Sequence, residues 1–134
     1  MSRRKSREHA FRLLYQIQIN NEETEEQIQR YIEENSLSEA ASIYVQKALR
    51  HISVHKDEID QDLSQFLAKN WTIDRIPKVE LAIMRLAYYE ILNMEDVPKS
   101  VAINEAVELA KAYAGDNAEK YINAVLANIQ AEGK

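Results

Sequence analysis

Glycine and proline are scarce in this chain, and their scarcity limits its fold more than any other feature. Among 134 residues there are two glycines, Gly115 and Gly133, and two prolines, Pro77 and Pro98. A multi-stranded sheet needs many tight turns, and these two residue types supply most of them. Ala, Leu, Glu, Gln, Lys and Ile are abundant instead, and most of these are strong helix formers. The sequence therefore predicts an all-α fold.

Apolar residues in the second half of the chain recur at the spacing of a helix face. Three such rows are present, and each places its apolar side chains on one side of a helix. The three helices are expected to form a helical core. The rows are Val79, Ala82, Ile83, Leu86, Ala87 and Ile91; Val101, Ile103, Ala106, Val107 and Ala110; and Ile122, Val125, Leu126 and Ile129.

About seven helices are expected in all, with short connections that favour packing between neighbours within a single domain, 1–134. A joint at 70–77 divides this domain into subdomains of about 1–70 and about 71–134. In the joint, Trp71 and Ile76 are expected to pack between the halves. The expected helices are 5–20, 24–35, 39–54, 56–69, 78–93, 100–114 and 118–130.

Positive charge is concentrated at the N-terminus of an otherwise acidic chain. The first 12 residues hold five basic side chains and one acidic one, a net charge of +4, which leaves −9 for the rest of a chain whose total is −5. Cations near a helix N-terminus oppose the helix dipole, so a bound polyanion would relieve an unfavourable arrangement. Charge alone allows two interpretations of this segment: an arm that binds nucleic acid, or a solvated, frayed terminus without a function. Four of the cations precede the apolar pattern and are expected to project beyond the core: Arg3, Arg4, Lys5 and Arg7.

Motifs for catalysis or cofactor binding are missing from the sequence. The chain has no cysteine, which excludes disulfides and Cys-ligated zinc, and it has no glycine-rich phosphate loop. His51 and His55 share a helix face with Glu58, but no H-E-x-x-H motif is formed, so ordinary histidines are expected rather than a metal site. We expect a non-enzymatic protein without a metal or other cofactor. No uncharged apolar stretch approaches the roughly 18 residues of a membrane span, and the lack of cysteine fits the cytoplasm.

Three sequence blocks beginning at Arg75, Val97 and Tyr121 carry a family pattern. They read RIPKVELAIMRLAYYEI, VPKSVAINEAVELAK and YINAVL, and 3–15 carry a further piece. In content, order and spacing, the blocks resemble the NusB family of bacterial transcription antitermination factors. The resemblance implies two small helical bundles in one domain, and binding rather than catalysis.

The resemblance also implies a set of partners. NusB-like proteins bind the single-stranded boxA element of nascent ribosomal RNA jointly with the ribosomal protein NusE. The pair then joins NusA, NusG and RNA polymerase to suppress premature termination. The alternative is a helical protein–protein interaction module without specific RNA binding, and a homodimer is possible.

Carried over residue by residue, the family's functional positions fall on both halves of the chain. The arginine-rich N-terminus corresponds to Arg3, Arg4, Lys5 and Arg7, and a second RNA-contacting region to Asn117, Lys120, Tyr121 and Asn123. The surface that faces NusE corresponds to Tyr15 and Glu80, with Asp74 as a weaker candidate. Glu80 is expected to be exposed, whereas Arg85 and Glu90 are assigned to internal ion pairs.

Physical arguments agree with the second RNA-contacting region, although Tyr121 has two interpretations. Exposed N–H groups at a helix start favour anions, and Lys120 adds positive charge there. Tyr121 either stacks on an unpaired base or is a boundary aromatic of the core. Asn117 and Tyr121 stand where many relatives have Asp and Phe, and Ala124 replaces a Gly, which alters the detailed geometry.

Overall fold

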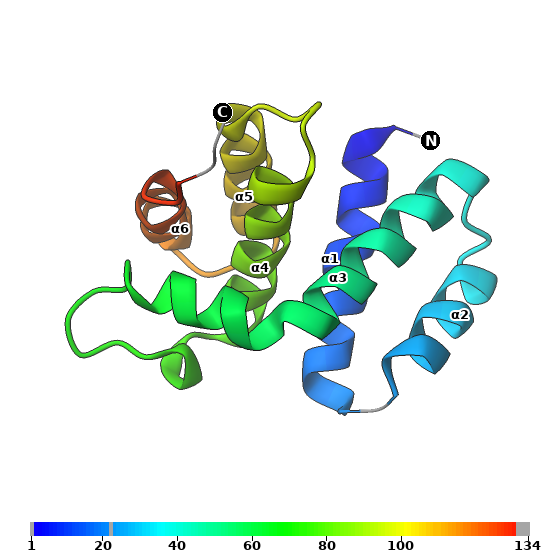
Figure 1. The fold of residues 1–134 in the computed structure, drawn as a ribbon, viewed down its shortest axis with the longest axis horizontal. Coiled ribbons are helices and arrows are strands. Elements are labelled where there is room, and N and C mark those ends of the chain that lie inside the picture. Colours follow the sequence, from blue (N-terminus) through cyan, green and yellow to red (C-terminus); the bar gives the residue numbers. More distant parts are fainter. Residues whose placement is uncertain (1, 22, 131–134) are drawn as a thin grey trace. The chain divides into compact units, whose positions relative to one another are not determined.

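The all-α prediction is confirmed by the structure, a computed structural model that describes residues 2–21 and 23–130 (Figure 1). Within these residues there is no strand. The elements are α1 (Arg3–Asn20), α2 (Thr24–Glu34), α3 (Glu39–Ser64), the 3-10 helix η1 (Ile73–Arg75), α4 (Lys78–Asn93), α5 (Lys99–Tyr113) and α6 (Ala118–Ala127).

The predicted count of seven helices is corrected to six α-helices among the described residues, because two expected helices are joined. Helix α3 continues through the predicted break and bends there: His55 has φ −105° and ψ 17°, outside the helical region. Neither proline nor glycine lies near His55, so nothing in the sequence terminates the helix at this point. The chain leaves the helix after Ser64, earlier than expected. In the segment that follows, Ile76 is buried as expected, but Trp71 is 48% exposed, so the packing predicted for Trp71 is wrong.

The chain divides into two compact units, Met1–His55 and Lys56–Lys134. The division falls at the kink in α3, whereas the sequence placed the joint at 70–77. That residues 1–134 form a single domain remains a prediction. Each unit has a core of its own: Phe11, Leu13, Leu14, Ile28, Val45, Leu49 and Ile52 are buried in the first, and Ile59, Leu63, Ile83, Met84, Leu86, Ile91, Ile122 and Leu126 in the second.

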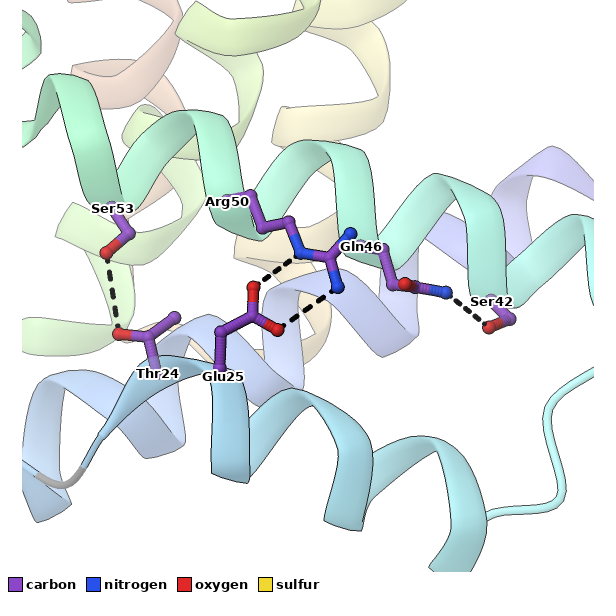
Figure 2. A network of polar contacts seen from close by, with 6 residues as sticks. All are labelled: Thr24, Glu25, Ser42, Gln46, Arg50 and Ser53. Atoms are coloured by element: carbon purple, nitrogen blue, oxygen red, sulfur yellow. Dashed lines mark hydrogen bonds and ion pairs between the residues drawn. The ribbon is translucent and has the colours of Figure 1, made fainter.

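Polar contacts join α2 to α3 within the first unit, as Figure 2 shows. The Arg50 guanidinium donates two hydrogen bonds to the Glu25 carboxylate, Nε to Oε1 at 2.5 Å and Nη2 to Oε2 at 3.1 Å. The hydrogen bond from Arg50 lowers the pKa of Glu25. One turn further along α3, the Ser53 hydroxyl lies 3.4 Å from that of Thr24. The contacts hold α2 along one side of α3.

In the second unit, α4 is joined to the last turns of α3 by two carboxylates. The buried Arg85 guanidinium donates to Asp60, from Nε to Oδ1 at 2.9 Å and from Nη2 to Oδ2 at 2.6 Å. The Tyr88 hydroxyl donates to Asp62 Oδ2 at 2.7 Å. Burial, and then the Asp62 carboxylate, raise the pKa of Tyr88. The internal ion pair predicted for Arg85 is thus confirmed, and Glu90 is also buried.

Lys99, the first residue of α5, caps the C-terminal end of α6. Its ammonium group donates to the carbonyl oxygens of Ala127 at 2.8 Å and Ile129 at 2.6 Å. The last carbonyls of a helix have no partner inside the helix and carry partial negative charge, so a cation is favoured there. In Figure 1, α4, α5 and α6 lie together in this unit. Lys99 joins the start of α5 to the end of α6.

Replacing Lys99 by methionine is expected to lower the free energy of unfolding by about 1–3 kcal/mol, since two charge-assisted hydrogen bonds are lost while most of the stem is kept. Urea denaturation followed by circular dichroism measures the change. Lys111→Met is the matched control, because the contact of Lys111 within the described part of the chain is an exposed ion pair with Glu108 at 3.9 Å. Equal effects of the two substitutions would show that the contacts of Lys99 do not stabilise the unit.

Candidate nucleic-acid interface

The basic N-terminal segment is helical from its first cation. Ser2 takes the N-cap position of α1, and its hydroxyl accepts a hydrogen bond from the Lys5 backbone N–H at 3.2 Å. Such a cap satisfies one of the free N–H groups of the first turn and fixes where the helix begins. The cations of this segment are therefore presented on the first turns of a helix, which begins two residues before the predicted start at residue 5 and so includes Arg3 and Arg4.

Arg3, Arg4 and Lys5 are exposed, and the contacts of Arg3 and Lys5 show how these side chains are oriented. The Arg3 guanidinium lies over the ring of Tyr44 on α3, 5.9 Å from its centre, within the range of a cation–π contact. The Lys5 ammonium is 3.6 Å from Glu8. No acidic residue is present in the first turn of α1, so the positive charge there is not offset by a neighbour on the same turn.

Arg7 differs from the other three cations, and its predicted exposure is wrong. Its exposed fraction is 6%. Arg7 precedes Ala10, Phe11 and Leu14 by three, four and seven positions, the spacing of one helix face, so it extends the buried row of α1 by one turn. This periodicity was present in the sequence and identifies Arg7 as an interior residue.

The start of α6 presents three exposed polar side chains: Asn117, Lys120 and Asn123. Asn117 occupies the N-cap position in a left-handed conformation, with φ 68°, which asparagine tolerates better than most residues. Its side chain makes no capping hydrogen bond. The Ala118 and Lys120 backbone N–H groups already donate to the carbonyl oxygens of Gly115 and Asn117, and Glu119 lies in the same turn. The donors left for an anion are the side-chain amide of Asn117 and the ammonium of Lys120.

Tyr121, a predicted RNA residue, is affected by the charge of Glu80, a predicted partner residue. The Tyr121 hydroxyl is buried and has no hydrogen-bond partner among the residues that the structure describes, while part of the side chain is exposed. Burial, and then the charge of Glu80, raise the pKa of Tyr121. Glu80 was expected to be exposed, but it is partly buried, and burial raises its pKa. Tyr121 is thus at a boundary, where its ring rather than its hydroxyl is available for stacking.

The other predicted partner residues lie on separate elements. Tyr15, in the first unit, is partly buried, and its ring stacks on Phe11 with the ring centres 6.4 Å apart. Asp74 is exposed on η1 in the second unit. Both can offer a side chain to a partner.

The histidine pair considered from the sequence lies at the kink of α3. The rings of His51 and His55 are 4.3 Å apart. Over 2–21 and 23–130, no group of three or more His, Cys, Asp or Glu side chains is arranged to hold a metal ion. In the same part of the chain, no helix is long and apolar enough to cross a membrane.

Replacing Tyr121 by phenylalanine is expected to leave the stability unchanged or to raise it by up to about 1 kcal/mol, because the hydroxyl is buried without a partner. Tyr88→Phe is the matched control: it removes a hydroxyl that donates to Asp62 and is expected to cost about 1–2 kcal/mol. Thermal and urea unfolding of both variants check the contrast. A loss in Tyr121→Phe equal to that in Tyr88→Phe would show that the Tyr121 hydroxyl has a partner in solution.

Comparison with known proteins relates this chain to one family. Residues 4–131 match the NusB family. The chain is 41% identical over 131 residues to the transcription antitermination protein NusB of Clostridium novyi, covering 96% of this chain and 98% of the relative. It is 39% identical over 134 residues to that of Listeria monocytogenes serotype 4a, with both chains covered in full.

Solved structures show the same relationship. The T. maritima NusB structure superimposes with a TM-score of 0.88 at 30% identity, over 95% of this chain and 89% of the other. A crystal structure of the antitermination factors NusB and NusE in complex with dsRNA gives a TM-score of 0.83 at 28% identity, over 93% and 92% of the two chains. Sequence and fold agree along nearly the whole length, and this chain belongs to the NusB family.

Proposed function

We propose that this protein is a transcription antitermination factor that binds single-stranded boxA RNA of nascent ribosomal RNA together with NusE. The observation that carries the proposal is the cluster of exposed cations on the capped start of α1, Arg3, Arg4 and Lys5, in a chain that is otherwise acidic. Acidic proteins repel RNA at long range, so binding requires locally concentrated positive charge. The related NusB protein that was solved with NusE and dsRNA supports the same assignment.

In this proposal the two candidate RNA regions have different tasks. Arg3, Arg4 and Lys5 bind backbone phosphates, which gives affinity without sequence preference. The start of α6 supplies Asn117, Lys120 and Asn123 for anions and polar base edges, and the ring of Tyr121 for stacking on an unpaired base. Arg7 supports α1 from inside rather than binding RNA. The protein acts by binding and not by catalysis.

The proposed partner surface includes Tyr15, Glu80 and Asp74. Two of these are acidic, which suits a basic ribosomal protein such as NusE. The charge of Glu80 acts on the Tyr121 hydroxyl, so in this proposal a partner bound at Glu80 approaches the ring that contacts RNA. The complex with NusE would then join NusA, NusG and RNA polymerase.

The proposal is tested by titrating a boxA-type RNA and a scrambled control of equal length with the native protein, with and without NusE, over a series of salt concentrations. We expect preference for boxA that increases with NusE, and affinity that falls as salt rises. Weak and equal binding of both RNAs, with NusE binding retained, would favour a protein–protein interaction module. Light scattering of the free protein checks for a homodimer that hides the partner surface.

A further inference from the structure

A histidine continues the row of cations along the outward side of α1. His9 follows the exposed Lys5 by four positions and precedes the exposed Arg12 by three. Residues at this spacing are neighbours on one face of a helix. His9 itself is partly exposed, whereas Ala10 and Leu13 on the opposite side are buried. The imidazole therefore lies between two cations on the same face of the helix.

The charge of this face stays positive when its acidic residue is included. Glu8 is the one acidic residue of α1, and its carboxylate is shared between two cations. Oε1 of Glu8 lies 3.6 Å from Lys5 Nζ, and Oε2 lies 3.8 Å from Arg12 Nη2. With the exposed Arg4, the face carries three positive charges and one negative charge while His9 is neutral, a net charge of +2. Protonation of His9 would add one more positive charge.

The His9 ring is held in place by α2. Its Nδ1 lies 2.8 Å from the Tyr31 hydroxyl, and the two rings pack edge to face with their centres 5.7 Å apart. A hydroxyl can donate to a neutral imidazole nitrogen or accept from a protonated one, so this contact fits both protonation states. The charged residues near Tyr31 in the sequence of α2 are Arg30, Glu33 and Glu34, but the charges that shift the pKa of His9 belong to α1.

His9 is mostly neutral in the free protein at pH 7. Burial, and then the charge of Arg12, lower its pKa from the ordinary value of about 6.5; Glu8 raises it, and Lys5 lowers it again. Part of the resistance to protonation is thus repulsion from the two neighbouring cations. An anion bound along Lys5 and Arg12 would offset that repulsion and favour the imidazolium.

We propose that His9 is a proton-linked RNA contact of α1: when phosphates bind along Lys5 and Arg12, the imidazole takes up a proton from the solvent and binds a phosphate as a further cation. With Nδ1 held by Tyr31, the donor to the phosphate is Nε2–H. The inference rests on the proposed function and adds to it a residue and a pH dependence. Because the complex holds one proton more than the free protein, RNA affinity rises as the pH falls.

The test measures binding of a single-stranded boxA-type RNA to the full chain by fluorescence anisotropy, over a salt series at about pH 8 and about pH 5.5. We expect binding near 0.1 M salt to be about three- to tenfold tighter at the lower pH, and the log–log salt slope to be larger there by about 0.7, the value for one further single-strand phosphate contact. His9→Gln keeps a hydrogen-bonding side chain but does not titrate, so it should lose this pH dependence. Thermal unfolding at both pH values shows that the chains are folded.

His51→Gln is the matched control, because it removes a partly exposed histidine from α3 in the same unit. It should keep the pH dependence of the native chain. A second measurement follows the three imidazoles by NMR titration with and without saturating RNA. We expect RNA to raise the pKa of His9 and to leave those of His51 and His55 unchanged, whereas a purely structural role of His9 would leave its pKa the same in both states.

The outcomes separate a failure of the inference from a failure of the proposed function. If the native chain binds RNA in a salt-dependent way and His9→Gln keeps the native pH dependence, the inference is wrong and the proposed function stands. If His51→Gln loses as much of the pH dependence as His9→Gln, the effect follows the net charge, and the inference is overturned. If the native chain shows no salt-dependent RNA binding at either pH, the proposed function itself is wrong.

Discussion

Replacing Asp60 by alanine is expected to lower the free energy of unfolding by about 3–5 kcal/mol, the largest loss from any single substitution considered for this chain. The reason is the buried guanidinium of Arg85, which donates to both carboxylate oxygens of Asp60. Without the carboxylate, the buried positive charge loses the two charge-assisted hydrogen bonds that it makes to Asp60. Urea unfolding of the native and variant chains gives the difference directly.

Two further variants make this expectation specific. Asp57→Ala removes an exposed acid from the same helix and is expected to change the stability by less than about 0.5 kcal/mol. Asp60→Asn keeps the shape of the side chain and one acceptor oxygen, so its loss of stability is expected to lie between those of Asp57→Ala and Asp60→Ala. This variant can still be measured if Asp60→Ala does not fold. If Asp60→Ala costs no more than Asp57→Ala, Arg85 finds water or another acceptor, and the pair contributes little.

The second large effect is expected on RNA binding when Arg3, Arg4 and Lys5 are all replaced by alanine. At about 0.7 per phosphate on a single strand, three contacts correspond to about 2 units of log–log salt slope, and to roughly a hundredfold in affinity near 0.1 M salt. Helix α1 should persist, since alanine favours helix and Ser2 still caps it. Anisotropy titrations of a boxA-type RNA over a salt series measure both quantities.

The matched control for this triple variant removes the same amount of charge from other exposed positions. A variant in which three exposed lysines are replaced by alanine has the same net charge, and it is expected to keep nearly the whole salt slope. If both triple variants lose the same slope, the cations on α1 contribute no more than other surface cations, and there is no local RNA site on α1. The control residues are Lys56, Lys69 and Lys111.

Much of the fold was predictable because helix patterns are local. Apolar spacing and the scarcity of glycine and proline were enough to place α4, α5 and α6 to within a few residues. The break at His55 was also located, but whether a break ends a helix or only bends it depends on packing around it, which the sequence does not display. Trp71 was misplaced for a related reason: residue type predicts average burial, whereas the path of a loop decides the individual case.

The candidate site was less predictable, because burial of a polar residue depends on the helix face it occupies. Arg7 was grouped with its basic neighbours on charge alone, although its spacing to Ala10, Phe11 and Leu14 places it on the buried side. The effect of the Glu80 charge on the pKa of Tyr121 links a residue of α4 to one of α6 and has no local signature in the sequence. It becomes visible only once the tertiary structure is known.

The cap that Ser2 provides to α1 has a thermodynamic consequence for association. Fixing the backbone of one residue costs about 1–2 kcal/mol of conformational entropy, so a disordered basic arm would meet this cost at each residue when it binds. Here the first turn is already ordered in the free protein, and the cost is met during folding. Encounter with a polyanion then requires little rearrangement of the backbone, and more of the attraction between cations and phosphates remains as net affinity.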